Sequence, residues 1–222
     1  MKSKIIVIEG LDGSGKATQT ALLAEKLSGR GLKVRRLEFP DYQSPSSSLV
    51  KMYLGGEFGS KPEDVNAYTA SAFYAVDRAA GYLKDWKKDY QSGALFLSDR
   101  YATSNLIYQM SKVKDSERDG FIAWQQDFEY DKLGLPRPDA VIYLDVSPEV
   151  SQKLMEKRYG GDSSKKDLHE SNLSFLLSCR KSALYAARKL GWTVINCCKN
   201  GEIKSIETIS EEIEKALKEV LC

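Results

Sequence analysis

The sequence predicts an α/β protein whose mainly parallel sheet carries helices on both faces. Continuous apolar runs rich in β-branched residues alternate with segments of helical periodicity along the 222 residues. This alternation is typical of parallel strands joined by crossover helices. The first apolar run leads directly into a glycine-rich loop and a helix. Because no linker or repeat interrupts the pattern, we expect a single domain over residues 1–222.

The first half of the chain contains three predicted strands. They cover residues 4–9 (KIIVIE), 33–39 (KVRRLEF) and 94–100 (ALFLSDR). The first run is apolar enough to be buried on both faces, as central parallel strands are. Between the first two strands, a helix follows the glycine-rich loop and ends near Gly29 and Gly31.

The segment between the second and third strands has two predicted parts. Residues 41–61 contain Pro, Ser and Gly, which favour a loop with a short helix. Pro62 suits a first helical position, and from there to about Tyr90 the pattern is helical and rich in Ala, Tyr and Phe. The helix around residues 65–82 could be an interface or part of the core.

The second half of the chain continues the alternation. Phe121, Trp124 and Phe128 lie on one helical face, residues 139–146 (DAVIYLDV) form a buried strand, and a helix begins near Val150.

A polar, basic segment, residues 157–167 (KRYGGDSSKKD), then breaks the pattern. Helical periodicity resumes over residues 173–187, and residues 193–196 (TVIN) form the last predicted strand. An amphipathic helix over residues 206–220 closes the chain.

The composition excludes several classes of protein. A net charge of +2, with 42% hydrophobic and 29% charged residues, favours an ordinary globular protein without nucleic-acid or membrane partners. The beginning, MKSKIIVIEG, turns polar too soon for a signal peptide, and no apolar run approaches the ~20 residues of a membrane span. The four cysteines form no C-x-x-C pair, so we expect neither zinc nor disulfides, and a cytoplasmic location.

The segment IEGLDGSGKATQT (residues 8–20) has the spacing of a phosphate-binding loop. The backbone N–H groups of such a loop and the following helix N-terminus bind phosphate, and Lys16 would reach the β- and γ-phosphates. A glycine-rich turn with a solvent-facing lysine is the alternative, but it does not explain why a buried strand leads into the loop. The predicted nucleotide-binding residues are Gly10, Leu11, Asp12, Gly13, Ser14, Gly15, Lys16, Ala17 and Thr18.

One position departs from the usual loop pattern. Ala17 stands where a Ser or Thr hydroxyl would bind Mg²⁺, and Thr18 lies about 100° further round the helix. Because Mg²⁺ keeps several waters and binds nucleotide oxygens, a nearby carboxylate could hold it. Asp99 is the first candidate and Glu9 the second. Ala17 also leaves open a non-catalytic nucleotide-binding protein.

The carboxyl ends of the predicted strands carry further candidates. Glu9, Phe39, Asp99 and Asp145 all lie there, at the edge where parallel sheets bind ligands. Arg100 follows directly and could clamp a phosphate, with Asp99 holding metal-bound water. A plain surface charge pair is the alternative for these two neighbours.

In FYAVDR (residues 73–78), Tyr74 precedes Arg78 by one helical turn. Such an aromatic ring can stack on a base while the arginine donates to a base carbonyl. On a helix, however, aromatic residues more often belong to the core.

Together these motifs resemble the thymidylate kinase family. The loop, FP at 39–40, FYAVDRA, DRYATSNLIYQ and LGLPRPDAVIYLDVSPE occur in one order at matching separations, and the resemblance runs from about Lys4 to the helix near Leu190. That family transfers the γ-phosphate of ATP to dTMP with Mg²⁺, giving dTDP for dTTP and DNA precursor synthesis. The resemblance therefore implies a P-loop nucleoside-monophosphate-kinase-like fold, a basic lid at about 157–170 and a homodimer.

The resemblance also implies a set of substrate contacts from several segments. The base would meet Phe39, Tyr74 stacked on thymine, Arg78 donating to O4, and Asn105 reading the thymine edge. The sugar would meet Asp12 at its 3′-hydroxyl and Tyr108 where a 2′-hydroxyl would be, and the acceptor phosphate would meet Arg100. His169 and Glu170 stand where relatives often have a Tyr-Glu pair.

Two more departures from the family pattern concern cations. After Phe39-Pro40, many relatives carry an arginine that touches the acceptor phosphate, whereas this chain has Asp41 and Tyr42. Tyr42 could still donate one hydrogen bond to that phosphate, but the positive charge is gone. Gly13 stands where some relatives carry a loop arginine. The catalytic cation would then come from the lid. Arg158 is favoured over Lys165 and Lys166, because it ends a helix and its guanidinium can bridge two phosphate oxygens. A solvated charged loop is the alternative. The predicted catalytic residues are Lys16, Asp99, Arg100 and Arg158.

Three rival functions stay open beside this prediction. The first is a kinase for another nucleotide or a deoxynucleoside. The second is a GTP-binding switch, which would need an Asn-Lys-x-Asp tetrapeptide that the sequence lacks. The third is the non-catalytic nucleotide-binding protein.

Overall fold

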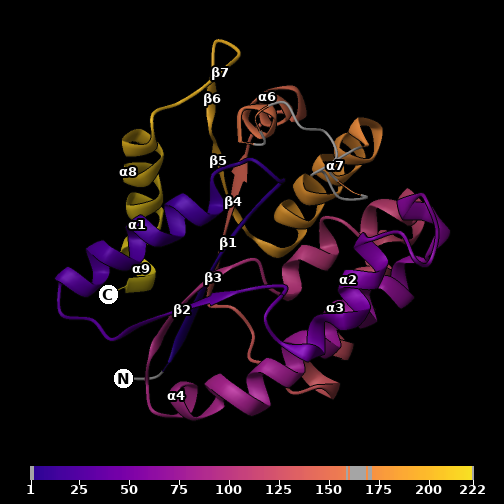
Figure 1. Cartoon of the computed structure of the whole chain (residues 1–222). Coiled ribbons are helices and arrows are strands. Elements are labelled where there is room, and N and C mark those ends of the chain that lie inside the picture. The colour runs from indigo at the N-terminus through magenta and orange to yellow at the C-terminus, as the bar shows by residue number, and fades with distance from the viewer. Residues whose placement is uncertain (1–2, 159, 161–168, 170–171, 222) are drawn as a thin grey trace.

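The computed structural model describes residues 3–158, 160, 169 and 172–221. At its centre lies a five-stranded sheet of order β2-β3-β1-β4-β5, in which every neighbouring pair is parallel (Figure 1). The predicted α/β fold class is thereby confirmed. The strands are β1 (Lys4–Gly10), β2 (Val34–Glu38), β3 (Leu95–Asp99), β4 (Ala140–Asp145) and β5 (Thr193–Asn196).

Helices cover both faces of the sheet, and each face has its own hydrophobic core. The side chains of β1 alternate between the two, with Ile5 and Val7 in one core and Ile6 and Ile8 in the other. The second core is completed by α1 (Lys16–Gly29) and α8 (Ile206–Ala216), and the first by α5 (Arg118–Gln126) and α7 (Leu173–Leu190), among others. Figure 1 shows α1 and α8 on one side of the strands and α7 on the other.

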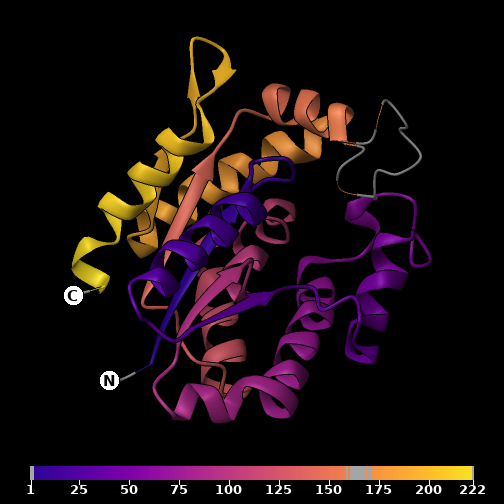
Figure 2. The same cartoon turned by 60° about the vertical axis from the view of Figure 1, so that its left-hand side comes forward.

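Further helices and turns complete the described part of the chain. The remaining helices are α2 (Ser48–Leu54), α3 (Ala67–Gly81), α4 (Lys87–Gln91), α6 (Pro148–Arg158) and α9 (Lys218–Leu221). In Figure 2, the end of β2 points toward α2 and α3, which lie beyond the sheet. The 3-10 turns are η1 (Pro45–Ser47), η2 (Pro62–Asp64), η4 (Ala102–Leu106), η5 (Met110–Lys112) and η6 (Asp115–Glu117), and the π turns are η3 (Tyr82–Trp86) and η7 (Asp127–Lys132).

The predicted helix from Pro62 to about Tyr90 is interrupted. Val65 is extended, and Asn66 begins a new helix, because its side-chain oxygen accepts a 2.9 Å hydrogen bond from the backbone N–H of Thr69. The π turn η3 then separates α3 from α4.

The prediction that residues 193–196 form the last strand is wrong. A small antiparallel hairpin follows, made of β6 (Cys198–Lys199) and β7 (Glu202–Ile203). Its turn residues Asn200 and Gly201 both have positive φ, at 54° and 78°. Asn-Gly is a strong signal for such a tight hairpin, so the sequence contained the information.

Among the residues that the structure describes, no helix combines the length and the apolar character that a bilayer crossing requires.

Candidate active site

A cavity of about 790 Å³ lies beyond the carboxyl ends of the strands. The phosphate-binding loop forms its middle, α3 and η4 form one end, and the start of α8 forms the other. Among the predicted site residues, those that line it are Asp12, Gly13, Ser14, Gly15, Lys16, Ala17, Thr18, Phe39, Tyr42, Tyr74, Arg78, Asp99, Arg100, Asn105, Tyr108 and His169.

The loop owes its shape to its glycines. Gly13 and Gly15 have φ of 75° and 86°, a left-handed region that other residues rarely adopt. A Cβ on Gly13 would lie 2.8 Å from the carbonyl oxygen of Ser151 and 2.9 Å from Cγ of Met155. Because helix α6 approaches this closely, the loop has no room for an arginine at position 13.

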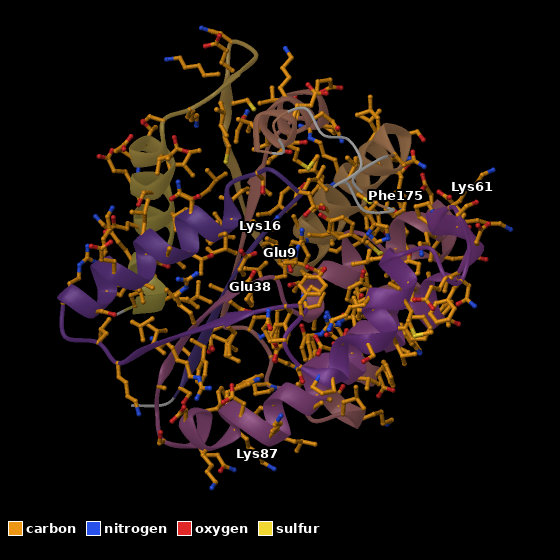
Figure 3. All side chains as sticks on the ribbon, in the orientation of Figure 1. Glu9, Lys16, Glu38, Lys61, Lys87 and Phe175 are labelled. Carbon is orange, nitrogen blue, oxygen red and sulfur yellow. The ribbon has the colours of Figure 1, made fainter. Side chains whose placement is uncertain are left out.

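Lys16 stands at the first position of α1, at the centre of the cavity. Its ammonium donates a 2.8 Å hydrogen bond to the carbonyl oxygen of Leu11, within the loop. Burial and the nearby Arg100 lower the pKa of Lys16, and Asp12 acts in the opposite direction. Figure 3 shows Lys16 close to Glu9, near the centre of the molecule. The geometry holds a cation where a loop-bound phosphate would lie.

Arg100, Asp12 and Tyr108 form a second polar group beside the loop. The guanidinium of Arg100 pairs with Oδ1 of Asp12 and lies 5.0 Å from the ring centroid of Tyr108. The Tyr108 hydroxyl donates to Oδ2 of Asp12 over 2.9 Å. Burial alone would raise the pKa of Asp12, but Arg100 and Lys16 outweigh it and lower the pKa to about 2. Arg100 has a φ of 65°, the kind of strain that concentrates at functional sites.

The two predicted metal-binding carboxylates have different surroundings. Glu9 is fully buried, and its oxygens accept hydrogen bonds from the hydroxyls of Thr103 and Ser104 at 2.7–2.9 Å. Burial raises the pKa of Glu9, whereas Arg100 lowers it. Asp99 lines the cavity at the end of β3. Of these two carboxylates, Asp99 lines the cavity and Glu9 does not, so Asp99 better suits an ion that also takes nucleotide oxygens and water.

The described ranges contain no cluster of candidate ligands that could hold a metal ion on its own. No group of three or more His, Cys, Asp or Glu side chains is placed there to hold an ion.

The α3 end of the cavity is built on a buried ion pair. Nε and Nη2 of Arg78 each donate to the carboxylate of Glu129 over 2.7 Å. The Asn105 amide donates to the same carboxylate over 2.8 Å, and the Gln125 amide does so over 3.2 Å. Arg78 and Glu129 are 1% and 0% exposed. This end therefore combines polar side chains with deep burial.

The loop after β2 is held by α3. Both oxygens of Asp77 accept hydrogen bonds, one from the backbone N–H of Asp41 at 2.9 Å and one from the hydroxyl of Ser46 at 2.6 Å. Asp77 is itself buried. The loop thereby carries Phe39 into the first core and Tyr42 to the cavity wall.

His169 forms part of the cavity wall at the α3 end. Its ring stacks on Tyr108 at 5.5 Å, and its Nε2 lies 2.8 Å from the hydroxyl of Tyr53. Burial lowers the pKa of His169 to about 3.

Other predicted residues do not reach the described cavity wall. Gly10 and Leu11 are buried beneath the loop, and the side chain of Arg158 lies outside the described residues. So do Lys165, Lys166, Glu170 and nearly all of the predicted lid, residues 157–170.

Several cavity residues were not predicted from the sequence. Glu38, exposed at the end of β2, is one, and Gln19 is another, with its amide donating to the Ile206 carbonyl over 2.9 Å. Glu129, which lies behind the wall, was also missed, because it belongs to no recognisable motif and lies about 100° round a helix from Phe128. The further wall residues are Pro40, Leu54, Ser104, Gln109, Leu154, Met155, Ile203, Lys204, Ile206 and Ile209.

Comparison with known proteins agrees with this arrangement. The thymidylate kinase family model matches residues 8–213. A thymidylate kinase of Mycobacterium tuberculosis is 33% identical over 190 residues, which cover 82% of this chain and 84% of that protein. A probable thymidylate kinase of Thermococcus onnurineus is 34% identical over 155 residues, covering 69% and 71%.

Solved structures agree on the fold. A thymidylate kinase structure from Candida albicans superposes with a TM-score of 0.70 at 20% identity, covering 99% of this chain and 93% of that one. One from Ehrlichia chaffeensis gives 0.67 at 22% identity, covering 98% and 100%. These structures share the P-loop fold of nucleoside monophosphate kinases, and the match along almost the whole sequence shows that the chain belongs to the thymidylate kinase family.

Proposed function

We propose that the protein transfers the γ-phosphoryl group of ATP to dTMP, giving dTDP for dTTP and DNA precursor synthesis. The observation that carries this proposal is one continuous cavity that joins a phosphate-binding loop to a buried, polar pocket at α3. The loop suits the donor phosphates, and the pocket suits a base. Family membership agrees with this assignment.

Charge neutralisation is the main task of the phosphate side. A dTMP phosphate oxygen would attack the γ-phosphorus, and the bond to the ADP leaving oxygen would break. Because that phosphate is already an anion, no strong base is needed, and catalysis depends on positioning and cations. Lys16 would hold the β- and γ-phosphates. Arg100 would give up part of its contact with Asp12 and bind the acceptor phosphate. Tyr42 would donate one hydrogen bond to the same phosphate.

We also propose that Asp99 holds a magnesium ion together with water and nucleotide oxygens. The ion, when bound, would neutralise charge on the transferring phosphoryl group. Asp99 fits because it lines the cavity at the end of β3. Glu9 fits less well, since its oxygens already accept hydrogen bonds from Thr103 and Ser104.

The α3 end would bind the thymine base and its sugar. Tyr74 would stack on the base, Phe39 would support the pocket from the core side, and Arg78 would donate to O4. Tyr108 lies against Asp12, so it would stand where a ribose 2′-hydroxyl would be while Asp12 meets the 3′-hydroxyl. Asn105 and His169 complete this wall.

The experiment is an assay of ADP formation from ATP and magnesium with dTMP, UMP, CMP and AMP side by side. We expect dTMP to be used far better than the others. Equal use of UMP and dTMP would contradict the base and sugar assignments. No turnover with any monophosphate, despite nucleotide binding, would favour the non-catalytic reading of Ala17.

We further propose a cytoplasmic homodimer. The support for a dimer is a set of exposed apolar side chains along α3 and η3, namely Tyr68, Val76 and Leu83, which are 46%, 49% and 66% exposed. Analytical ultracentrifugation of the wild-type protein and of a Val76→Lys, Leu83→Lys variant tests it. A wild-type monomer at micromolar concentration would contradict it.

A further inference from the structure

Glu129 lies directly behind the pocket wall. Its carboxylate is fully buried in the π turn η7, one layer beneath Arg78 and Asn105, which line the cavity. It accepts hydrogen bonds from both of these residues and from Gln125. This shared acceptor holds the side chains of Arg78 and Asn105 in place.

The carboxylate determines which atoms of Arg78 and Asn105 remain available to bind a ligand. A guanidinium only donates hydrogen bonds, so both Glu129 oxygens must act as acceptors. Asn105 must therefore turn its nitrogen, not its oxygen, toward Glu129. That nitrogen also donates to the backbone oxygen of Ser71 over 3.3 Å, so both of its hydrogens are used inside the protein.

Two polar atoms stay available for a ligand. Within the described part of the chain, neither Nη1 of Arg78 nor Oδ1 of Asn105 makes a hydrogen bond. The first can only donate and the second can only accept. The wall thus presents one donor and one acceptor, both fixed by the same carboxylate.

We propose that Glu129 is a positioning residue that makes the pocket select thymine over cytosine. Thymine presents an acceptor at O4 and a donor at N3–H, which match the donor of Arg78 and the acceptor of Asn105. Cytosine presents the reverse, a donor at its 4-amino group and an acceptor at N3. Buried groups left unpaired make such a mismatch costly. This inference rests on the proposed function and deepens it.

The test is Glu129→Gln, assayed with dTMP and with dCMP on the same enzyme preparation. A glutamine cannot accept at both oxygen positions, so Asn105 can turn its nitrogen to the pocket and Arg78 loses one acceptor. We expect the ratio of kcat/KM for dTMP to that for dCMP to fall by about 10- to 100-fold, chiefly through KM. The KM for ATP should stay within a few-fold. The ratio does not depend on the fraction of folded enzyme.

The matched control is Glu214→Gln. Glu214 pairs with Lys26 and Arg30, away from the cavity, so this variant also loses a paired carboxylate. We expect its dTMP-to-dCMP ratio to equal that of the wild type. An unchanged ratio in Glu129→Gln, with a wild type that phosphorylates dTMP, overturns the inference alone. A wild type that does not phosphorylate dTMP overturns the proposed function instead.

A second measurement is made on the wild-type protein, and a variant serves only to assign one resonance. In wild-type protein labelled with ¹⁵N, the side-chain NH₂ of Asn105 should exchange slowly with water and shift little when dTMP binds. An Asn105→Asp sample, which lacks that resonance, assigns it. An NH₂ group that exchanges rapidly and shifts strongly with dTMP would place the nitrogen in the pocket, and the inference would be wrong.

Discussion

The two ends of the cavity are built in different ways. At the phosphate end, one continuous segment shapes the backbone, and its lysine hydrogen-bonds to the same segment. At the base end, Arg78, Asn105 and Glu129 come from α3, η4 and η7 and meet in a buried network. At the first end a side chain can serve chemistry without supporting the fold. At the second, the groups that would read the base also belong to the core.

Loss of the lid cation should reduce catalysis more than any other change. Arg158→Ala should lower kcat by about 10³-fold or more, because an arginine that neutralises transition-state charge contributes that much. The dTMP-binding constant should stay nearly unchanged, because dTMP lies at the other end. Lys165→Ala and Lys166→Ala are the controls. A near-normal kcat in Arg158→Ala removes it from the mechanism, and a large loss of dTMP binding moves it to the acceptor side.

The next prediction concerns stability at the base end. Arg78→Met leaves the buried Glu129 carboxylate without its main partner, which should lower the free energy of unfolding by about 3–5 kcal/mol. Chemical unfolding monitored by tryptophan fluorescence measures this. The double variant Arg78→Met, Glu129→Leu should recover much of the loss, because no lone buried charge is left. A loss below about 1 kcal/mol in Arg78→Met would break the contrast between the two ends.

Lys16→Ala is the corresponding change at the phosphate end. We expect kcat to fall by about 10²- to 10³-fold, in the range of other lost transition-state charge contacts. The free energy of unfolding should change by less than about 1 kcal/mol, because the loop keeps its backbone shape. The dTMP-to-dCMP ratio should equal that of the wild type. Activity within a few-fold of normal would mean that the loop is not the donor site.

A smaller effect concerns the pH dependence of folding, through His169. In the unfolded chain this side chain binds a proton below about pH 6.5, whereas burial lowers its folded pKa to about 3. Stability is therefore lost as the pH falls from 6.5 toward 3. Between pH 7.5 and 5.5 the wild type should lose about 1 kcal/mol more than His169→Phe. Equal slopes for the two proteins in denaturant titrations would show that the histidine titrates normally.

The smallest expected effect is that of Ala17→Ser. It restores the hydroxyl that the loop pattern usually carries, but Mg²⁺ keeps several waters, so kcat should change by no more than about threefold. Steady-state kinetics at saturating ATP and magnesium measure it. A large rise in kcat would show instead that Ala17 limits catalysis.

The alternation of strands and helices and the phosphate-binding loop could be predicted from the sequence. Both depend on neighbouring residues: β1 is apolar on both faces, and the loop needs glycines at fixed spacing before Lys16. Local signals were also present where the prediction failed, as in Asn200-Gly201, which turns the β6–β7 hairpin.

The base end of the cavity and the roles of the carboxylates depend on how distant segments pack, so they could not be predicted from the sequence. Glu9 and Asp99 both lie near the carboxyl ends of buried strands, yet Glu9 accepts hydrogen bonds from Thr103 and Ser104, whereas Asp99 lines the cavity. Glu129 is 51 residues from Arg78 and gives no chemical motif. Its role depends on three segments that pack together in a buried region, where each hydrogen-bond donor needs an acceptor. The spacing of these residues along the chain does not show that they come into contact.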